Sequence, residues 1–175
     1  MPESRRRVEE LSEQNAEDLW SRSLNFLDGE RSRSWHEFQV HQPALYHYIV
    51  DRSESRFEPE VAELLEQTAS LIWRLFFSVD DELERIMAAN IEDLERSNAS
   101  VLQLLSDESS LHSNFEDRFD MLMEHSSDLP QRHLFRLTFE HLDTAHSDRN
   151  PELDDFNFAL LMFYLRVFID CLDQA

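Results

Sequence analysis

The stretch FNFALLMFYLRVFI, residues 156–169, is apolar on nearly every side of the helix that it would form. A helix without a polar face for solvent is typical of the centre of a domain. A second, shorter stretch of the same kind, LIWRLFFSV, covers residues 71–79. The two stretches predict a pair of central helices, with more polar helices packed around them.

Start signals for helices recur along the rest of the chain. Ser34, with Glu37 three residues later, forms a capping-box pattern. Pro59 stands between two glutamates, and proline followed by acid is favoured in a first helical turn. Asn150 followed by Pro151 predicts the start of the last helix, with asparagine as the N-cap.

Stop signals divide the same pattern into separate helices. Gly29 follows the first apolar periodicity and is expected to cap its end. Pro43 is expected to kink or split the second helix. A helix is expected to begin near residues 78–81, and the Asn-Ala-Ser run at 98–100 suggests a break within it.

These signals predict an all-α fold. No alternating strand pattern of convincing length competes with them, and a single glycine in 175 residues disfavours tight hairpins. We expect one domain over residues 1–175, a helical bundle or orthogonal array of about six to eight helices. Residues 1–14 are expected to form a frayed N-terminus.

The composition is acidic and contains no lysine. Sixteen arginines face 37 aspartates and glutamates, which gives a formal charge of −21. The acids are spread along the chain and are densest between residues 51 and 100, as in a charged coat over a core. Such a charge disfavours direct binding of nucleic acid, which requires a basic face.

Several functional classes lack their sequence signals. One glycine excludes a phosphate-binding loop, a dinucleotide fingerprint and a nucleophile elbow. One cysteine, Cys171, excludes an intrachain disulfide and a cysteine-based zinc cluster. Without a secretion signal or an apolar run of about 20 residues, we expect a cytoplasmic protein that does not span a membrane. We expect no enzymatic activity and no cofactor.

Two arginines interrupt the apolar stretches. Arg74 lies within residues 71–79 and Arg166 within residues 156–169. An unpaired charge in a buried helix costs several kcal/mol, so each guanidinium needs a partner. One interpretation is a pocket in which Arg74, Arg166 and the neighbouring Trp73 bind an anionic ligand or a partner protein. The alternative is that each arginine reaches solvent or pairs with an internal acid.

A metal site has weaker support. Glu140, Asp143 and His146 share one face of a predicted helix. The Glu-x-x-His motif of carboxylate-bridged di-iron bundles is absent there, and acids with histidine at helical spacing usually form a solvated face. A metal site is therefore not favoured, and these three residues are its weak candidates.

The sequence thus predicts a non-catalytic interaction or regulatory module that binds a protein partner. The partner would offer a basic surface, or an apolar segment that docks in a groove between helices. One alternative is a helical metal- or small-ligand-binding protein, which would leave enzymatic activity open. Another is an acidic DNA mimic or an inhibitor of the immunity type. A homodimer remains open, with Trp20 and Trp35 as candidates for its surface.

Overall fold

The computed structural model describes residues 11–25, 28–79, 83–106, 115–125, 131–147 and 153–175. Every regular element in these ranges is an α-helix. The helices are α1 (Glu13–Leu24), α2 (Asp28–His41), α3 (Pro43–Arg56), α4 (Pro59–Val79), α5 (Ala88–Ser97), α6 (Ala99–Ser106), α7 (Phe115–His125), α8 (Arg132–Ser147) and α9 (Asp155–Asp173). The all-α fold is confirmed, although the described helices number nine rather than six to eight.

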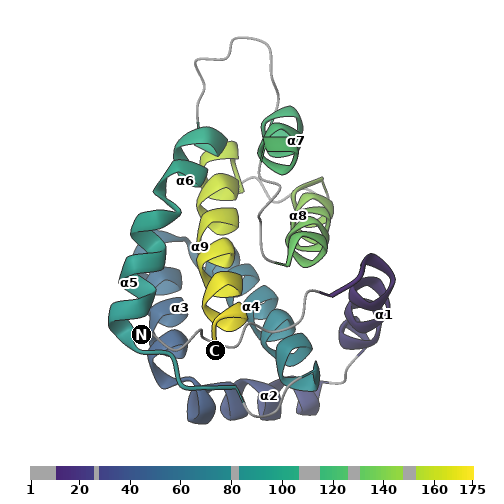
Figure 1. Cartoon of the computed structure of the whole chain (residues 1–175), viewed down its shortest axis with the longest axis vertical. Coiled ribbons are helices and arrows are strands. Elements are labelled where there is room, and N and C mark those ends of the chain that lie inside the picture. Colours follow the sequence, from purple (N-terminus) through teal and green to yellow (C-terminus); the bar gives the residue numbers. More distant parts are fainter. Residues whose placement is uncertain (1–10, 26–27, 80–82, 107–114, 126–130, 148–152) are drawn as a thin grey trace, which may run out of the picture.

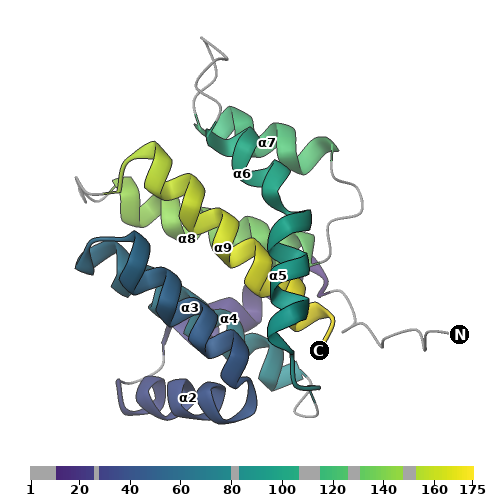
Figure 2. The same ribbon diagram turned by 90° about the vertical axis from the view of Figure 1, so that its left-hand side faces the viewer.

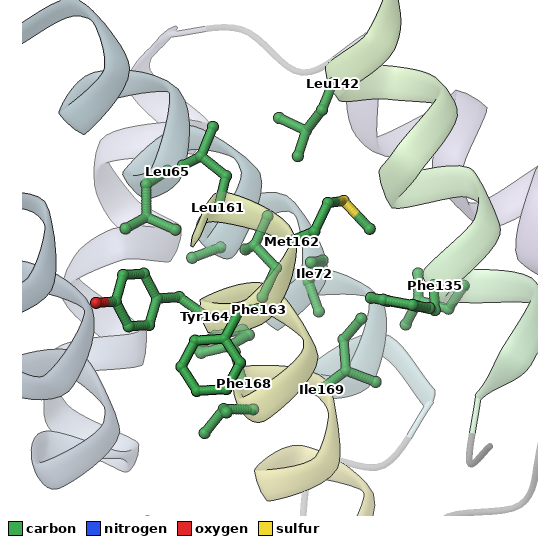
Figure 3. Close-up of a cluster of buried hydrophobic side chains, with 14 of the residues drawn as sticks. Leu65, Ile72, Phe135, Leu142, Leu161, Met162, Phe163, Tyr164, Phe168 and Ile169 are labelled. Atoms are coloured by element: carbon green, nitrogen blue, oxygen red, sulfur yellow. The ribbon is translucent and has the colours of Figure 1, made fainter. Parts of the chain in front are cut away.

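Helix α9 forms the centre of the molecule (Figure 1). Fifteen of its nineteen residues are buried, and it packs against α3, α4, α5, α6 and α8. Its apolar side chains project toward Leu65 and Ile72 of α4 and toward Phe135 and Leu142 of α8 (Figure 3). Burial of each large apolar side chain contributes about 1.5–3 kcal/mol, so this helix anchors the fold.

The other helices surround α9 in two groups. Helices α3, α5 and α6 lie on one side of α9, whereas α7 and α8 lie on the other (Figure 1). Helix α2 lies crosswise at the lower end, next to α3 and α4 (Figure 2). Helix α1 packs against α4 and α8. Helix α4 therefore has α9 on one side and both α1 and α2 on another.

Three of the predicted boundaries are confirmed. Helix α2 ends at His41 and α3 begins at Pro43, so the proline splits the segment. Helix α4 begins at Pro59. Asn98 ends α5, where its backbone N–H donates to the carbonyl of Leu94, and α6 follows at once. This break accounts for the ninth helix.

The expected boundary between the first two helices is wrong. Helix α1 already ends at Leu24, and Gly29 lies in the first turn of α2 instead of capping α1. Ser34 lies in the middle of α2 and is buried, so it caps nothing. Helix α1, in contrast, does have a side-chain N-cap. It is Ser12, whose Oγ accepts a hydrogen bond of 3.4 Å from the N–H of Asn15.

The helix expected near residues 78–81 begins later than predicted. Residues 83–87 are not helical, and α5 begins only at Ala88. The cause is Gln42, which is fully buried between α2 and α3. Its Nε2 donates to the carbonyl of Glu84 at 2.8 Å, and its Oε1 accepts from the N–H of Ile86 at 2.9 Å. These bonds hold the segment outside a helix.

The last helix also begins later than predicted. Asn150 and Pro151 lie outside the described residues, but Leu153 and Asp154 are not helical. Asp154 is the N-cap of α9, and its Oδ1 accepts from the N–H of Asn157 at 2.8 Å. Aspartate satisfies a free N–H of the first turn and its charge faces the positive end of the helix dipole.

Among the described helices, none combines the length and the apolar character that crossing a membrane requires.

Candidate functional site

An open cleft of about 430 Å³ lies between α1, α2, α4 and α8. Its volume is in the range of ligand-binding sites, roughly 300–1,000 Å³. The lining combines arginine, glutamate, serine and apolar side chains from these four helices. The lining residues are Ser23, Leu24, Arg31, Ser32, Trp35, Glu63, Glu66, Gln67, Ser70, Leu71, Arg74 and His141.

Half of this lining belongs to one stripe along α4. The stripe consists of Glu63, Glu66, Gln67, Ser70, Leu71 and Arg74. Successive members of the stripe are alternately three residues and one residue apart along the chain, and this spacing keeps them on one face of the helix. From Glu63 to Arg74 there are eleven steps along the helix, and at 1.5 Å per step they give the stripe a length of about 16 Å. Its N-terminal end is acidic and its C-terminal end is basic.

The carboxylates at the acidic end are held by neighbours. Glu66 accepts a hydrogen bond of 2.6 Å from the hydroxyl of Ser53, which is fully buried on α3. Glu63 accepts a hydrogen bond of 2.7 Å from Nε2 of Gln67, one turn further along α4. The two carboxylates are therefore held in place by neighbours in the same chain.

The basic end joins two arginines from different helices. Burial lowers the pKa of the Arg74 guanidinium, and the nearby charge of Arg31 lowers it too, whereas Glu30 and Glu37 raise it. The group stays protonated, because arginine does not lose its proton in proteins. At this end of the cleft Arg74 and Arg31 thus lie close to acids of α2, and charges of both signs meet there.

The walls of the cleft are partly aromatic. Trp35 is half-buried and packs against Phe38 and Tyr46, with ring centroids 5.4 and 5.2 Å away. His141 reaches the cleft from α8, and burial lowers the pKa of its imidazole. The His141 ring meets Trp20 edge to face at 5.5 Å. Because Trp20 is only 6% exposed, its proposed place on a dimer surface is wrong.

Arg166 does not line the cleft. Its side chain is buried and pairs with Asp170, with Nη2–Oδ1 and Nε–Oδ2 distances of 2.6 and 3.1 Å. The Oδ1 contact is an ion pair without an aligned hydrogen bond, whereas Oδ2 also accepts from Asn98 at 2.9 Å. The guanidinium lies 5.3 Å from the ring centre of Phe135. Pairing with an internal acid, one of the two alternatives for Arg166, is thus what the structure contains.

Trp73 also lies away from the cleft. It is 1% exposed and packs between Phe38 and Phe77, with ring centroids 5.2 and 5.1 Å away. Its indole N–H has no hydrogen-bond acceptor among the described residues. Of the three residues predicted to bind a ligand or partner, Arg74 is the one that lines the cleft.

The weak metal candidates lie on α8. Glu140 and Asp143 are exposed there, and the side chain of His146 lies outside the described residues. Within the described ranges, no three or more histidine, cysteine, aspartate or glutamate side chains lie close enough together to share a metal ion.

Most of the cleft was missed at the level of sequence. The polar stripe of α4 is readable, since Glu63, Gln67, Ser70 and Arg74 recur at helical spacing. Such a stripe normally faces solvent, and nothing in its spacing shows that other helices flank it. The residues from α1, α2 and α8 join it only through tertiary packing.

Comparison of the chain with known protein families, curated proteins and solved structures finds no match.

Proposed function

We propose that this protein is a non-catalytic interaction module that binds a partner protein through the cleft. The observation that carries the proposal is the stripe of α4, which lies open between three other helices and bears charged side chains, of which the Glu66 carboxylate is held by Ser53. Grooves between helices are a common docking site for segments of partner proteins. Charged groups that are already positioned lower the ordering cost of binding.

The distribution of acids supports the same function. Exposed aspartates or glutamates occur on eight of the nine described helices, all except α6. A field of this kind speeds the approach of a partner with positive charge. A DNA mimic would instead need its acids gathered in rows on one face, so the distribution gives that alternative no support.

A small anionic ligand is the second candidate. Arg31 and Arg74 line one end of the cleft, and the volume of about 430 Å³ fits such a ligand. Arginine is the usual side chain for carboxylate and phosphate groups because its planar donors match them. Mass spectrometry of the protein under native conditions would detect a ligand that purifies with it.

The proposed function is tested by capture from host lysate with purified protein as bait. The bait is compared with Arg74→Glu, in the cleft, and Arg96→Glu, on α5, where the arginine side chain is 73% exposed. Both variants change the net charge equally, so charge alone affects them alike. We expect the parent and Arg96→Glu to capture the same partner and Arg74→Glu to lose it.

Circular dichroism of all three proteins ensures that the loss does not reflect unfolding. Equal capture by both variants would place the binding surface elsewhere. Loss of capture by the parent and by Arg96→Glu at high salt would show that the interaction depends on charge.

A further inference from the structure

Residues 83–87, between α4 and α5, form an extended segment at the surface. The segment is not helical, and Met87 at its end has φ and ψ of −91° and 148°. Ile86 is buried, whereas Arg85 and Met87 on either side of it are exposed, as in a strand whose side chains alternate between two faces. The segment runs along the outside of the molecule beside α2 (Figures 1 and 2).

One edge of this backbone is already paired by the side chain of Gln42. The same carboxamide donates to the carbonyl of Glu84 at 2.8 Å and accepts from the N–H of Ile86 at 2.9 Å. In an extended chain, a carbonyl and the N–H two residues later point to the same edge. The buried side chain of Gln42 therefore takes the place that a neighbouring strand would have at this edge.

The opposite edge offers three backbone groups. They are the N–H and the carbonyl of Arg85 and the N–H of Met87, and none of them has a hydrogen-bond partner among the described residues. The carbonyl of Met87 differs from them, because it accepts from the N–H groups of Asn90 and Ile91 in the first turn of α5. An extended edge with unpaired backbone groups is a template for one more strand.

We propose that a partner protein adds an extended segment to this edge by β-strand addition. Three main-chain hydrogen bonds would join the segment to Arg85 and Met87, whether the two chains run parallel or antiparallel. This surface is separate from the cleft, which neither Arg85 nor Met87 lines. Its use therefore does not depend on the function of the cleft.

The side chains beside the edge indicate what the segment carries. Arg85 is exposed and forms no ion pair within the described residues, so an acid is favoured directly opposite it. Met87 is 65% exposed and Leu83 is partly exposed, so apolar side chains are favoured two positions before and after the acid. The expected pattern is apolar-x-acid-x-apolar, which is the same in both directions of the chain.

A second copy of the chain fits this edge poorly. Two copies related by a two-fold axis would pair their edges antiparallel, and the pairing that uses both backbone groups of Arg85 places one Arg85 opposite the other. Like charges directly opposite each other destabilise a pair of strands. Each copy also carries a formal charge of −21, which adds repulsion between the two molecules.

Three pentapeptides with blocked ends are the probes. The first is Leu-Thr-Glu-Thr-Leu, and the second has Lys in place of Glu. The third has the first sequence with N-methyl groups on Glu and on the second Thr, which removes the N–H that would donate to Arg85 in either direction. Each is titrated into ¹⁵N-labelled protein and followed by amide chemical shifts. We expect the first peptide to bind about tenfold more tightly than either of the others.

Hydrogen exchange gives a readout that is specific to strand addition. With the first peptide bound, the N–H groups of Arg85 and Met87 should exchange more slowly than in the free protein. The N–H of Ile86 donates to Gln42 with or without the peptide, so its exchange should change little. Slower exchange at alternate residues would follow the two edges of the segment.

Proline substitutions remove the same donor from the protein. Met87→Pro lacks one N–H of the edge, whereas Met87→Ala lacks only the side chain. Ala88→Pro is the matched control, because residue 88 is the first of α5, where proline is tolerated. We expect Ala88→Pro to bind the first peptide as the parent does, Met87→Pro to bind it about tenfold more weakly, and Met87→Ala to lie between them. Circular dichroism verifies folding, and the N-methylated peptide makes the same test without changing the protein.

Three results would overturn the proposal. They are equal binding of the first and the N-methylated peptide, binding without slower exchange at Arg85 and Met87, and no binding of any peptide. Slower exchange at these two residues that appears without peptide as the protein concentration rises would assign the edge to a second copy and equally overturn it. Loss of lysate capture by Arg74→Glu does not depend on this edge, so failure of strand addition is distinguishable from failure of the proposed function.

Discussion

Arg166 shows how a charge is accommodated at the centre of this fold. The Arg166 side chain is 3% exposed and that of its partner, Asp170, is 8% exposed. Burial raises the pKa of the Asp170 carboxyl, and Arg166 opposes that change. Each charge depends on the other, because loss of one partner leaves the other buried and uncompensated.

We therefore expect strong coupling between substitutions at these two positions. Arg166→Met or Asp170→Leu alone should lower the free energy of unfolding by about 3–5 kcal/mol. The double variant should recover much of this loss, since apolar side chains of similar volume then fill the site. Urea denaturation of all four proteins gives the coupling energy, and additive losses would contradict the expectation.

Gln131 combines an unusual backbone angle with two buried side-chain hydrogen bonds. Its φ of 51° lies in the left-handed region, and it is 1% exposed. Its Oε1 accepts from the N–H of Leu11 at 3.1 Å, and its Nε2 donates to Asp173 at 2.9 Å. The side chain therefore joins the beginning of α1, the start of α8 and the end of α9.

This combination predicts an unusual order of stability. Gln131→Ala loses both side-chain bonds and keeps the unfavourable backbone angle, whereas Gln131→Gly loses the bonds but accepts the angle. We expect both variants to be less stable than the parent, with the glycine variant more stable than the alanine variant by about 1 kcal/mol. Urea midpoints measure the difference, and the reverse order would contradict a strained backbone at this position.

At the scale of single residues, local partners are predictable and distant ones are not. Arg166 and Asp170 are four positions apart, so their pairing follows from helical spacing. Asn98 and Phe135, which complete the same site, come from other helices. The sequence shows that Arg166 needs a partner, but the rest of its surroundings depends on packing.

At the scale of helices, two prolines gave correct boundaries because their effect is confined to the backbone, whereas the helix predicted to start at Pro151 begins later. Pro43 and Pro59 each begin a helix as predicted. The boundary before α5 was wrong because Gln42, more than 40 positions away, holds residues 83–87 in place. The predicted start of α9 was wrong for another reason, because both Asn150 and Asp154 are residue types that can cap a helix and they stand four positions apart.

The cap of α9 can be tested directly. Asp154→Ala should lower the free energy of unfolding by about 1 kcal/mol, because the N–H of Asn157 loses its acceptor and the helix dipole loses a nearby negative charge. Asn150→Ala is the matched comparison and should have a smaller effect. If the two thermal unfolding midpoints ranked in the opposite order, Asn150 would be the cap that matters.

At the scale of the whole molecule, the two central helices were predictable and the cleft was not. Residues 71–79 and 156–169 are apolar almost throughout, which predicts core helices whatever the topology, and most of their described side chains are buried. The cleft depends on how α1, α2 and α8 are arranged around α4, and spacing along the chain does not encode that arrangement. Arg74 was found because it interrupts an apolar stretch, whereas Trp35 and His141 have no such local signal.

His141 links the cleft to the stability of the whole fold. Burial lowers the pKa of its imidazole below the ordinary value of about 6.5. At pH values between the lowered pKa of the folded protein and the ordinary pKa of the unfolded chain, the unfolded chain therefore binds more protons than the folded protein. Stability therefore falls as the pH drops below about 6.5.

We expect His141→Phe, which keeps an aromatic ring beside Trp20, to lose less stability than the parent protein between pH 7.5 and 5.5. Urea midpoints at both pH values measure this, and His47→Phe, at an exposed position of α3, separates burial of His141 from the removal of a histidine in general. An unchanged pH dependence in His141→Phe would show that the cleft does not exclude the protonated imidazole.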